Sequence, residues 1–167
     1  MNSSPSIILA IAPGKREFGV AVFDGTDLIY SSVKTIKHRK SNELQFSEVA
    51  VIMQILFESF APHIVVIKAI SQYQKLSREL GLILKLIRFE SKQAGVQVVE
   101  ITFEQIKIEL CSGEQSTQKK AFESLTDEYP ELKRFWNRPN KWQNDYYAFL
   151  FSAVAVGAVF LKNRSRM

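Results

Sequence analysis

Three strand-like segments follow one another at the start of the sequence, before any helical periodicity begins. Residues 6–12 form a continuous run of apolar, mostly β-branched side chains, which predicts a buried strand. A second apolar segment covers 18–23 and a third covers 27–36, with the turn sequence Asp24-Gly25 between them. Strands that succeed one another through tight turns pair in an antiparallel manner, so we expect a three-stranded meander.

Helices and strands alternate in the rest of the chain. We predict, in order, a helix over 42–60, a strand over 63–70, a helix over 71–94, a strand over 96–101, helices over 102–110 and 118–127, an irregular segment over 130–141 and a last helix from about 142. A strand–helix–strand unit joins parallel strands by a crossover. The fold class is therefore α/β, with one domain over 1–167: a mixed five-stranded sheet of three antiparallel strands followed by βαβ crossovers, flanked by helices.

The composition and charge of the chain indicate which binding partners and which cellular compartment to expect. Hydrophobic residues make up 46% and charged residues 23%, a typical balance for a globular domain. The net charge of +5 favours polyanions such as nucleic acid, although a solvated cationic surface explains the charge equally well. The single cysteine, Cys111, excludes an intrachain disulfide and a cysteine-rich zinc site. With no secretory signal at the N-terminus, we expect a reducing, cytoplasmic setting.

The apolar stretch over 146–161, followed by Lys162, Arg164 and Arg166, resembles a C-terminal membrane anchor. It is shorter than the roughly 20 residues needed to span a bilayer. It is also rich in Ala, Val and Gly, as a helix packed closely on a sheet would be. We therefore expect a buried helix and no membrane.

Three segments, taken in order, carry a family resemblance: IILAIAPGKREFGVAVFDG (7–25), PHIVVIKAI (62–70) and FLFSAVAVGAVF (149–160). The first resembles the opening motif of the RuvC-type Holliday-junction resolvases, where the first strand ends in Asp-Pro-Gly. The second resembles the strand of that family that ends with a glutamate, and the third resembles its final helix, which has an Asp-Ala-small-Ala pattern. The resemblance covers nearly the whole chain and implies a ribonuclease H-like fold and a nuclease of DNA recombination.

The resemblance also implies an active site built from carboxylates. Two Mg²⁺ ions, roughly 3.5–4 Å apart, would activate water and stabilise the leaving oxygen. At the matching positions this sequence has Ala12, Lys68 and Ser152. We expect Ala12 and Lys68 at adjacent, parallel strand ends that face one cleft. An alternative register of the last motif offers Asp145, the best remaining carboxylate. Because one carboxylate cannot build a two-metal site, we expect impaired catalysis, no metal ligands and no cofactor, with Mg²⁺ needed only if the protein is unexpectedly active.

Lys68 has two interpretations. Its ammonium group can take the place of the metal's charge, by pairing with Asp145 or by holding a phosphate. Alternatively, Lys68 lies at the end of its strand and extends to water.

Two basic sets are candidate contacts for nucleic acid. The helix over 71–94 carries Lys75 and, on one stripe, Arg78, Lys85, Arg88 and Lys92. The second set is Arg134, Arg138 and Lys141, interleaved with Phe135, Trp136 and Trp142. Arginine and aromatic side chains can stack on unpaired bases. A solvated helix face explains the first set equally well, and tryptophans that pin a loop to the core explain the second.

The leading hypothesis is a RuvC-like protein that binds branched DNA or structured RNA and has impaired catalysis. One alternative is an active, metal-dependent junction endonuclease with relocated carboxylates such as Glu17, Asp24 and Asp145. Another is a protein-interaction scaffold or a homodimer that reuses the fold. His38 and His63 have no companion at metal-ligand spacing, so we expect both to be structural or exposed.

Overall fold

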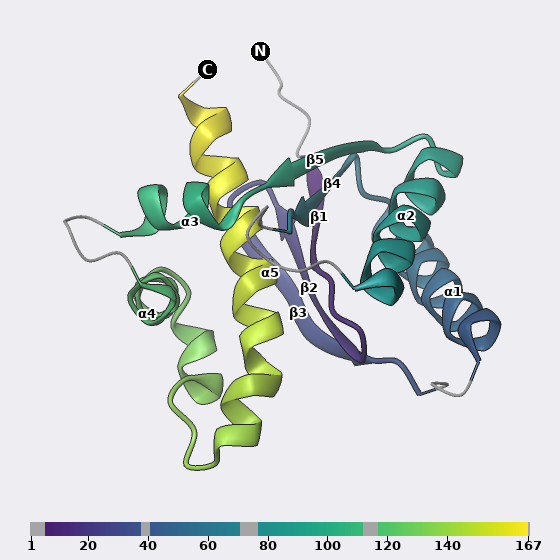
Figure 1. Cartoon of the computed structure of the whole chain (residues 1–167). Coiled ribbons are helices and arrows are strands. Elements are labelled where there is room, and N and C mark those ends of the chain that lie inside the picture. The colour runs from purple at the N-terminus through teal and green to yellow at the C-terminus, as the bar shows by residue number, and fades with distance from the viewer. Residues whose placement is uncertain (1–5, 38–40, 71–76, 112–116, 167) are drawn as a thin grey trace.

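The computed structural model describes residues 6–37, 41–70, 77–111 and 117–166 (Figure 1). The elements are, in order, β1 (Ile7–Ala12), β2 (Glu17–Asp24), β3 (Asp27–Thr35), α1 (Asn42–Phe60), β4 (Ile64–Lys68), α2 (Arg78–Gln93), β5 (Gln97–Ile101), α3 (Phe103–Leu110), α4 (Gln118–Glu128), the 3-10 helix η1 (Pro130–Phe135) and α5 (Lys141–Ser165). This order confirms the predicted succession of three strands followed by alternating helices and strands.

The five strands form one mixed sheet in the order β3-β2-β1-β4-β5. β1 pairs with β2, and β2 with β3, in an antiparallel manner, as the two tight turns require. β4 is parallel to both β1 and β5. The sheet is the mixed α/β arrangement that the sequence predicted, and the carboxyl ends of β1, β4 and β5 meet at one edge, here called the carboxyl edge.

Helices cover both faces of the sheet. α1 and α2 lie on one face, and α3, α4 and α5 lie on the other (Figure 1). Alternate residues of β1 serve the two layers: Ala10 and Ala12 pack in the α5 layer, whereas Leu9 and Ile11 pack in the layer of α1 and α2. Burial on both faces is the reason that β1 reads as a continuous apolar run.

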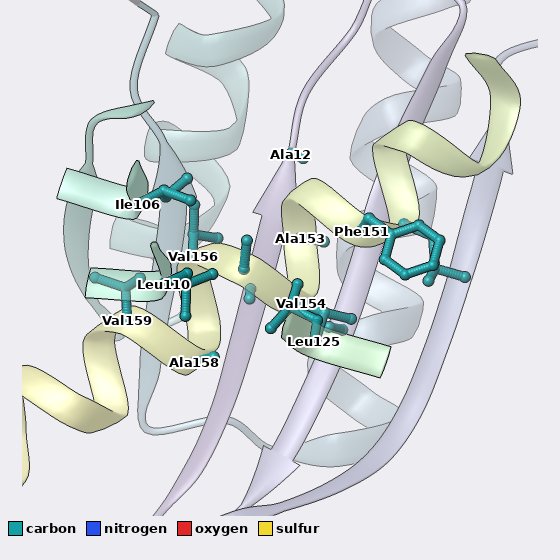
Figure 2. Packing of buried hydrophobic residues seen from close by; sticks show 14 of the residues in the cluster. Ala12, Ile106, Leu110, Leu125, Phe151, Ala153, Val154, Val156, Ala158 and Val159 are labelled. Atoms are coloured by element: carbon teal, nitrogen blue, oxygen red, sulfur yellow. The ribbon is translucent and has the colours of Figure 1, made fainter. Parts of the chain in front are cut away.

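The apolar C-terminal segment is the core helix α5. By length and hydropathy, α5 is the one helix among the described residues that could cross a membrane, but residues 150–159 are all buried within the fold (Figure 2). The helix backbone approaches β2 so closely that a Cβ on Gly19 would overlap the carbonyl oxygen of Phe149. The prediction of a buried helix is confirmed.

Two predicted boundaries differ from the structure. The helix expected over 71–94 begins at Arg78, after the N-cap Ser77, whose Oγ accepts a hydrogen bond from the Leu80 N–H at 3.2 Å; residues 71–76 lie outside the described part. A serine followed by charged residues in the first helical turn is a typical helix start. Our prediction followed the apolar periodicity and overlooked this signal. The segment expected to be irregular over 130–141 contains η1, which begins with Pro130 in its first turn.

Candidate nucleic-acid interface

Ala12 and Lys68 lie side by side at the carboxyl edge. The last pair of the parallel β1–β4 ladder is Ile11 with Ile67, and the next residues of the two strands are Ala12 and Lys68. Alternation along each strand directs both side chains toward α5, because Ala10 and Val66, two residues earlier, pack in that layer. The predicted adjacency of these two parallel strand ends is confirmed.

The third matching position, Ser152, reaches the same place from α5. Its hydroxyl accepts a hydrogen bond from the Lys68 ammonium at 3.5 Å. Ala12 is only 2% exposed and Ser152 only 5% exposed, so α5 closes the inner side of this site (Figure 2). The structure therefore brings Ala12, Lys68 and Ser152 together from three separate elements; Ala12 and Ser152 are covered, and Lys68 is partly exposed.

The Lys68 ammonium sits among weak acceptors. Besides Ser152, it lies 5.6 Å from the ring centroid of Phe103, the first residue of α3. Burial lowers the pKa of the Lys68 amine, because the charged form loses hydration. None of the ion pairs found among the described residues includes Lys68, and a cation without an anion is costly to bury. Lys68 is therefore a half-buried cation that lacks a carboxylate partner in the described part of the chain.

Sequence reasoning missed Phe103 and Lys107. The Lys107 ammonium lies 5.1 Å from the same Phe103 ring, so that ring faces two cations. The signal was present in the sequence: Phe103 follows Thr102, the N-cap of α3, and Thr102 follows the last residue of β5 at the carboxyl edge. An aromatic residue at that point faces the neighbouring strand end.

The residues at this site do not fit a Mg²⁺ ion. Ala12 offers no ligand atom, the Lys68 ammonium repels a cation, and the Ser152 hydroxyl is neutral and bonded to Lys68. In the part of the chain that the structure describes, no three His, Cys, Asp or Glu side chains gather closely enough to hold a metal ion.

The remaining carboxylates lie apart. Asp24 pairs with Ile7, at the opposite end of β1 from Ala12. Glu17 begins β2 and is half-buried near the carboxyl edge. Asp145 is exposed, about two helical turns before Ser152, and it lines a pocket against α4 rather than contacting Lys68. The structure does not gather Glu17, Asp24 and Asp145 into one site.

The first basic set lies on the layer opposite α5. Arg78, Lys85, Arg88 and Lys92 are all exposed on α2, and Ile83, Leu84 and Ile87 are buried on its other side. The Arg88 guanidinium forms an ion pair with Glu100 of β5, so it is partly engaged within the protein. Lys75 lies outside the described residues.

The second basic set lies between η1 and α5, at the same end of the molecule as the carboxyl edge (Figure 1). Arg134, Arg138 and Lys141 are exposed, and the Arg134 guanidinium lies 4.6 Å from the Phe135 ring centroid. The Asn144 side chain fixes the loop, since it accepts from the Arg138 N–H at 2.8 Å and donates to the Arg138 carbonyl at 2.9 Å.

The two tryptophans have different environments. Trp136 packs against Phe151 at 5.4 Å and against Phe122 at 6.4 Å between ring centroids, so it pins the loop to the core. Trp142, in the first turn of α5, is 66% exposed.

Lys15 and Arg16 are further cations that sequence reasoning did not single out. Both are exposed in the turn that follows Ala12, and they therefore lie at the carboxyl edge, where the Lys15 ammonium forms an ion pair with Glu79 of α2 at 3.8 Å. His63 is at the other end of the sheet, where its Nδ1 accepts from the Ile7 N–H at 3.2 Å. His38 is not among the described residues.

Known structures share this fold, although no family model and no curated protein matches the sequence. RuvC of T. thermophilus in complex with a Holliday junction substrate superposes with a TM-score of 0.75 at 18% identity, over 96% of both chains. Another structure of Thermus thermophilus RuvC gives 0.71 at 15% identity, over 95% of this chain and 96% of that one. The yeast mitochondrial Holliday junction resolvase Ydc2 gives 0.68 at 10% identity, over 97% of this chain and 80% of that one. The chain therefore has the RuvC-type, ribonuclease H-like fold of the Holliday-junction resolvases.

Proposed function

We propose that this protein binds branched or structured nucleic acid along its carboxyl edge and does not cleave it. The observation that carries the proposal is the Lys68 ammonium, which lies between β1, β4 and α5 without a carboxylate partner among the described residues. In a fold whose solved relatives include a resolvase bound to a Holliday junction, this place calls for carboxylates and metal. A fixed cation there supports phosphate binding instead.

The surroundings of Lys68 support the same proposal. Exposed cations from the turn after β1 and from the η1–α5 loop lie at this end of the molecule: Lys15, Arg16, Arg134, Arg138 and Lys141. A strand of nucleic acid that crosses the carboxyl edge can make phosphate contacts on both sides of Lys68. The predicted α2 set, Arg78, Lys85, Arg88 and Lys92, is a second candidate surface on the opposite layer.

The test uses a four-way DNA junction, a duplex of the same sequence and a folded RNA. We expect junction binding that weakens steeply with salt, and no cleavage in Mg²⁺ or Mn²⁺. Metal-dependent cutting that disappears in Asp145→Ala would show an active endonuclease with relocated carboxylates. No binding of any of the three, even at low ionic strength, would favour a protein-interaction scaffold.

Self-association through α1 is a second proposal, because an apolar stripe of that helix is exposed. Leu44, Val51 and Ile55 are 53%, 51% and 55% exposed and recur at helical spacing. A homodimer that buries this stripe would join two copies of the carboxyl edge in one particle. Light scattering should give twice the mass of one chain, and Ile55→Lys should reduce it to one.

A further inference from the structure

A pocket of about 260 Å³ lies beside the carboxyl edge, between α4, the η1–α5 loop and α5. Four aromatic side chains from three segments line it: Phe122, Phe135, Trp136 and Phe151. We call it the aromatic pocket. Phe151 directly precedes Ser152, so the pocket is a neighbour of the Lys68 site along α5.

The walls of the aromatic pocket are held in place by ring contacts. Phe122 stacks on Phe151 at 5.3 Å between centroids, and the Trp136 ring meets both of them edge-on. Phe135 packs on Tyr147 at 4.8 Å. Phe122 and Phe151 are buried and form the floor, whereas Phe135 and Trp136 are partly exposed. Partly exposed, rigidly held rings bind flat, unpaired bases by stacking.

Charged and polar groups stand among these rings. Asp145 and Lys119 line the same pocket, and no ion pair engages either of them among the described residues. Asn137 also lines it, with a φ of 53°, a left-handed conformation that non-glycine residues seldom adopt. A carboxylate among aromatic rings is a hydrogen-bond acceptor for a planar ligand that has N–H groups on its edge.

We propose that the aromatic pocket binds one unpaired guanine, stacked on the partly exposed rings of Phe135 and Trp136, with the guanine N1–H and exocyclic amino group donating to the Asp145 carboxylate. Guanine presents two parallel donors, which match the two oxygens of a carboxylate. The exposed cations Arg134, Arg138 and Lys141 are placed to hold the attached phosphates. This inference rests on the proposed nucleic-acid binding and gives it a base preference that the fold alone does not supply.

The two tryptophans make a direct test possible. Trp142→Phe leaves Trp136, in the pocket wall, as the sole tryptophan of the chain. GMP and inosine monophosphate, which lacks the exocyclic amino group, are titrated into this variant, together with four-way junctions that carry an unpaired G or an unpaired T. We expect GMP to quench Trp136 fluorescence and to bind about tenfold more tightly than inosine monophosphate, which lacks one of the two donors to Asp145; tenfold corresponds to about 1.4 kcal/mol.

Asp145→Asn in the same background should abolish the preference for GMP and for the unpaired-G junction. Asp127→Asn, an identical change at an exposed position of α4 outside the pocket, should leave both unchanged. If junctions bind but GMP causes no quenching and the unpaired base has no effect, the pocket proposal is overturned and the proposed function stands. If GMP is preferred but no junction binds, the pocket is a site for a free nucleotide, which supports the pocket and overturns nucleic-acid binding.

Discussion

Lys68 combines a charge with a position that normally excludes one. The end of β4 packs against α5 and α3, and among the described residues the Lys68 ammonium contacts a hydroxyl and an aromatic ring. Such partners compensate only part of the hydration that a cation loses on burial. Lys68 therefore lowers the stability of the free protein, and an anionic ligand would relieve that cost.

The burial of Lys68 predicts a pH dependence of stability. Its folded-state pKa lies below the ordinary value of 10.5, so between these two pKa values the unfolded chain binds more protons. The contribution of Lys68 to the free energy of unfolding therefore rises with pH through that window, and its cost is fully present below it. Lys68→Met should remove this rise, so the variant gains most over the unmodified protein at neutral pH and less toward pH 10.5.

Urea denaturation at a series of pH values measures the difference between the two proteins. Lys120→Met is the matched control, because Lys120 is exposed on α4 and its replacement removes no buried charge. A pH-independent difference for Lys68→Met would contradict the burial of the charge.

The metal chemistry of the site should return only when charge and ligands change together. Lys68→Glu removes a cation and adds a carboxylate; Ala12→Asp and Ser152→Asp add two more around the same point. We expect calorimetric titration with Mn²⁺ to show no binding for the unmodified protein and progressively tighter binding along the single, double and triple variants. Equal Mn²⁺ affinity of the unmodified and triple-variant proteins, with the ions beside Ala12, would refute this account.

At the scale of elements, the position of α5 depends on small residues that face it. Gly19 of β2 has no Cβ where the helix backbone at Phe149 passes, and this contact helps set how α5 lies over the sheet. The same packing delivers Ser152 to Lys68 and Phe151 to the aromatic pocket. A change in the packing of α5 against Gly19 therefore affects both the Lys68 site and the aromatic pocket.

Gly19→Ala should lower the free energy of unfolding by about 1–3 kcal/mol, as overpacking of a close-packed core does. Urea denaturation monitored by circular dichroism gives the value. Gly25→Asn is the control: Gly25 has a φ of 61° with nothing near its missing Cβ, and asparagine tolerates that conformation. We expect a change within about 0.5 kcal/mol there, and an equally small change at Gly19 would mean that α5 can shift without cost.

At the scale of the whole molecule, cations at the two ends of α5 are engaged differently. Near its C-terminus, Lys162 and Arg166 form ion pairs with Glu128 and Glu109. Near its N-terminus, none of the ion pairs among the described residues includes Arg134, Arg138 or Lys141. These cations without an ion pair lie at the same end of the molecule as the carboxyl edge, where Lys15 pairs with Glu79 at 3.8 Å, and they support an oriented approach of nucleic acid.

This asymmetry predicts where the salt dependence of binding originates. Replacing Arg134 and Lys141 together by Gln should reduce the slope of log K against log salt by roughly 1–2, since each phosphate contact contributes about 0.9. Arg164→Gln, at the far end of α5 where Arg164 bonds to Ser6, should leave the slope unchanged. Equal reductions for both variants, measured by fluorescence anisotropy with a four-way junction, would place the interface elsewhere.

The sequence by itself determined the order of the elements and the layers they form. Apolar alternation and turn residues such as Asp24-Gly25 are local signals, because they depend on the backbone geometry of a few neighbouring residues. They were sufficient to predict the mixed sheet, the buried C-terminal helix and the adjacency of Ala12 and Lys68. The cytoplasmic setting stays a prediction.

Only the tertiary structure decided which distant side chains meet. Lys68 contacts Ser152 and Phe103 across separations of 84 and 35 residues, and Asp145 faces α4 instead of Lys68. Periodicity assigns a side chain to a face of its own helix. The rotation of α5 and its distance from the sheet follow instead from the close packing of all layers at once, including the close approach of the helix backbone to Gly19. The contacts of the buried cation, and the aromatic pocket beside it, are therefore properties of the packed molecule.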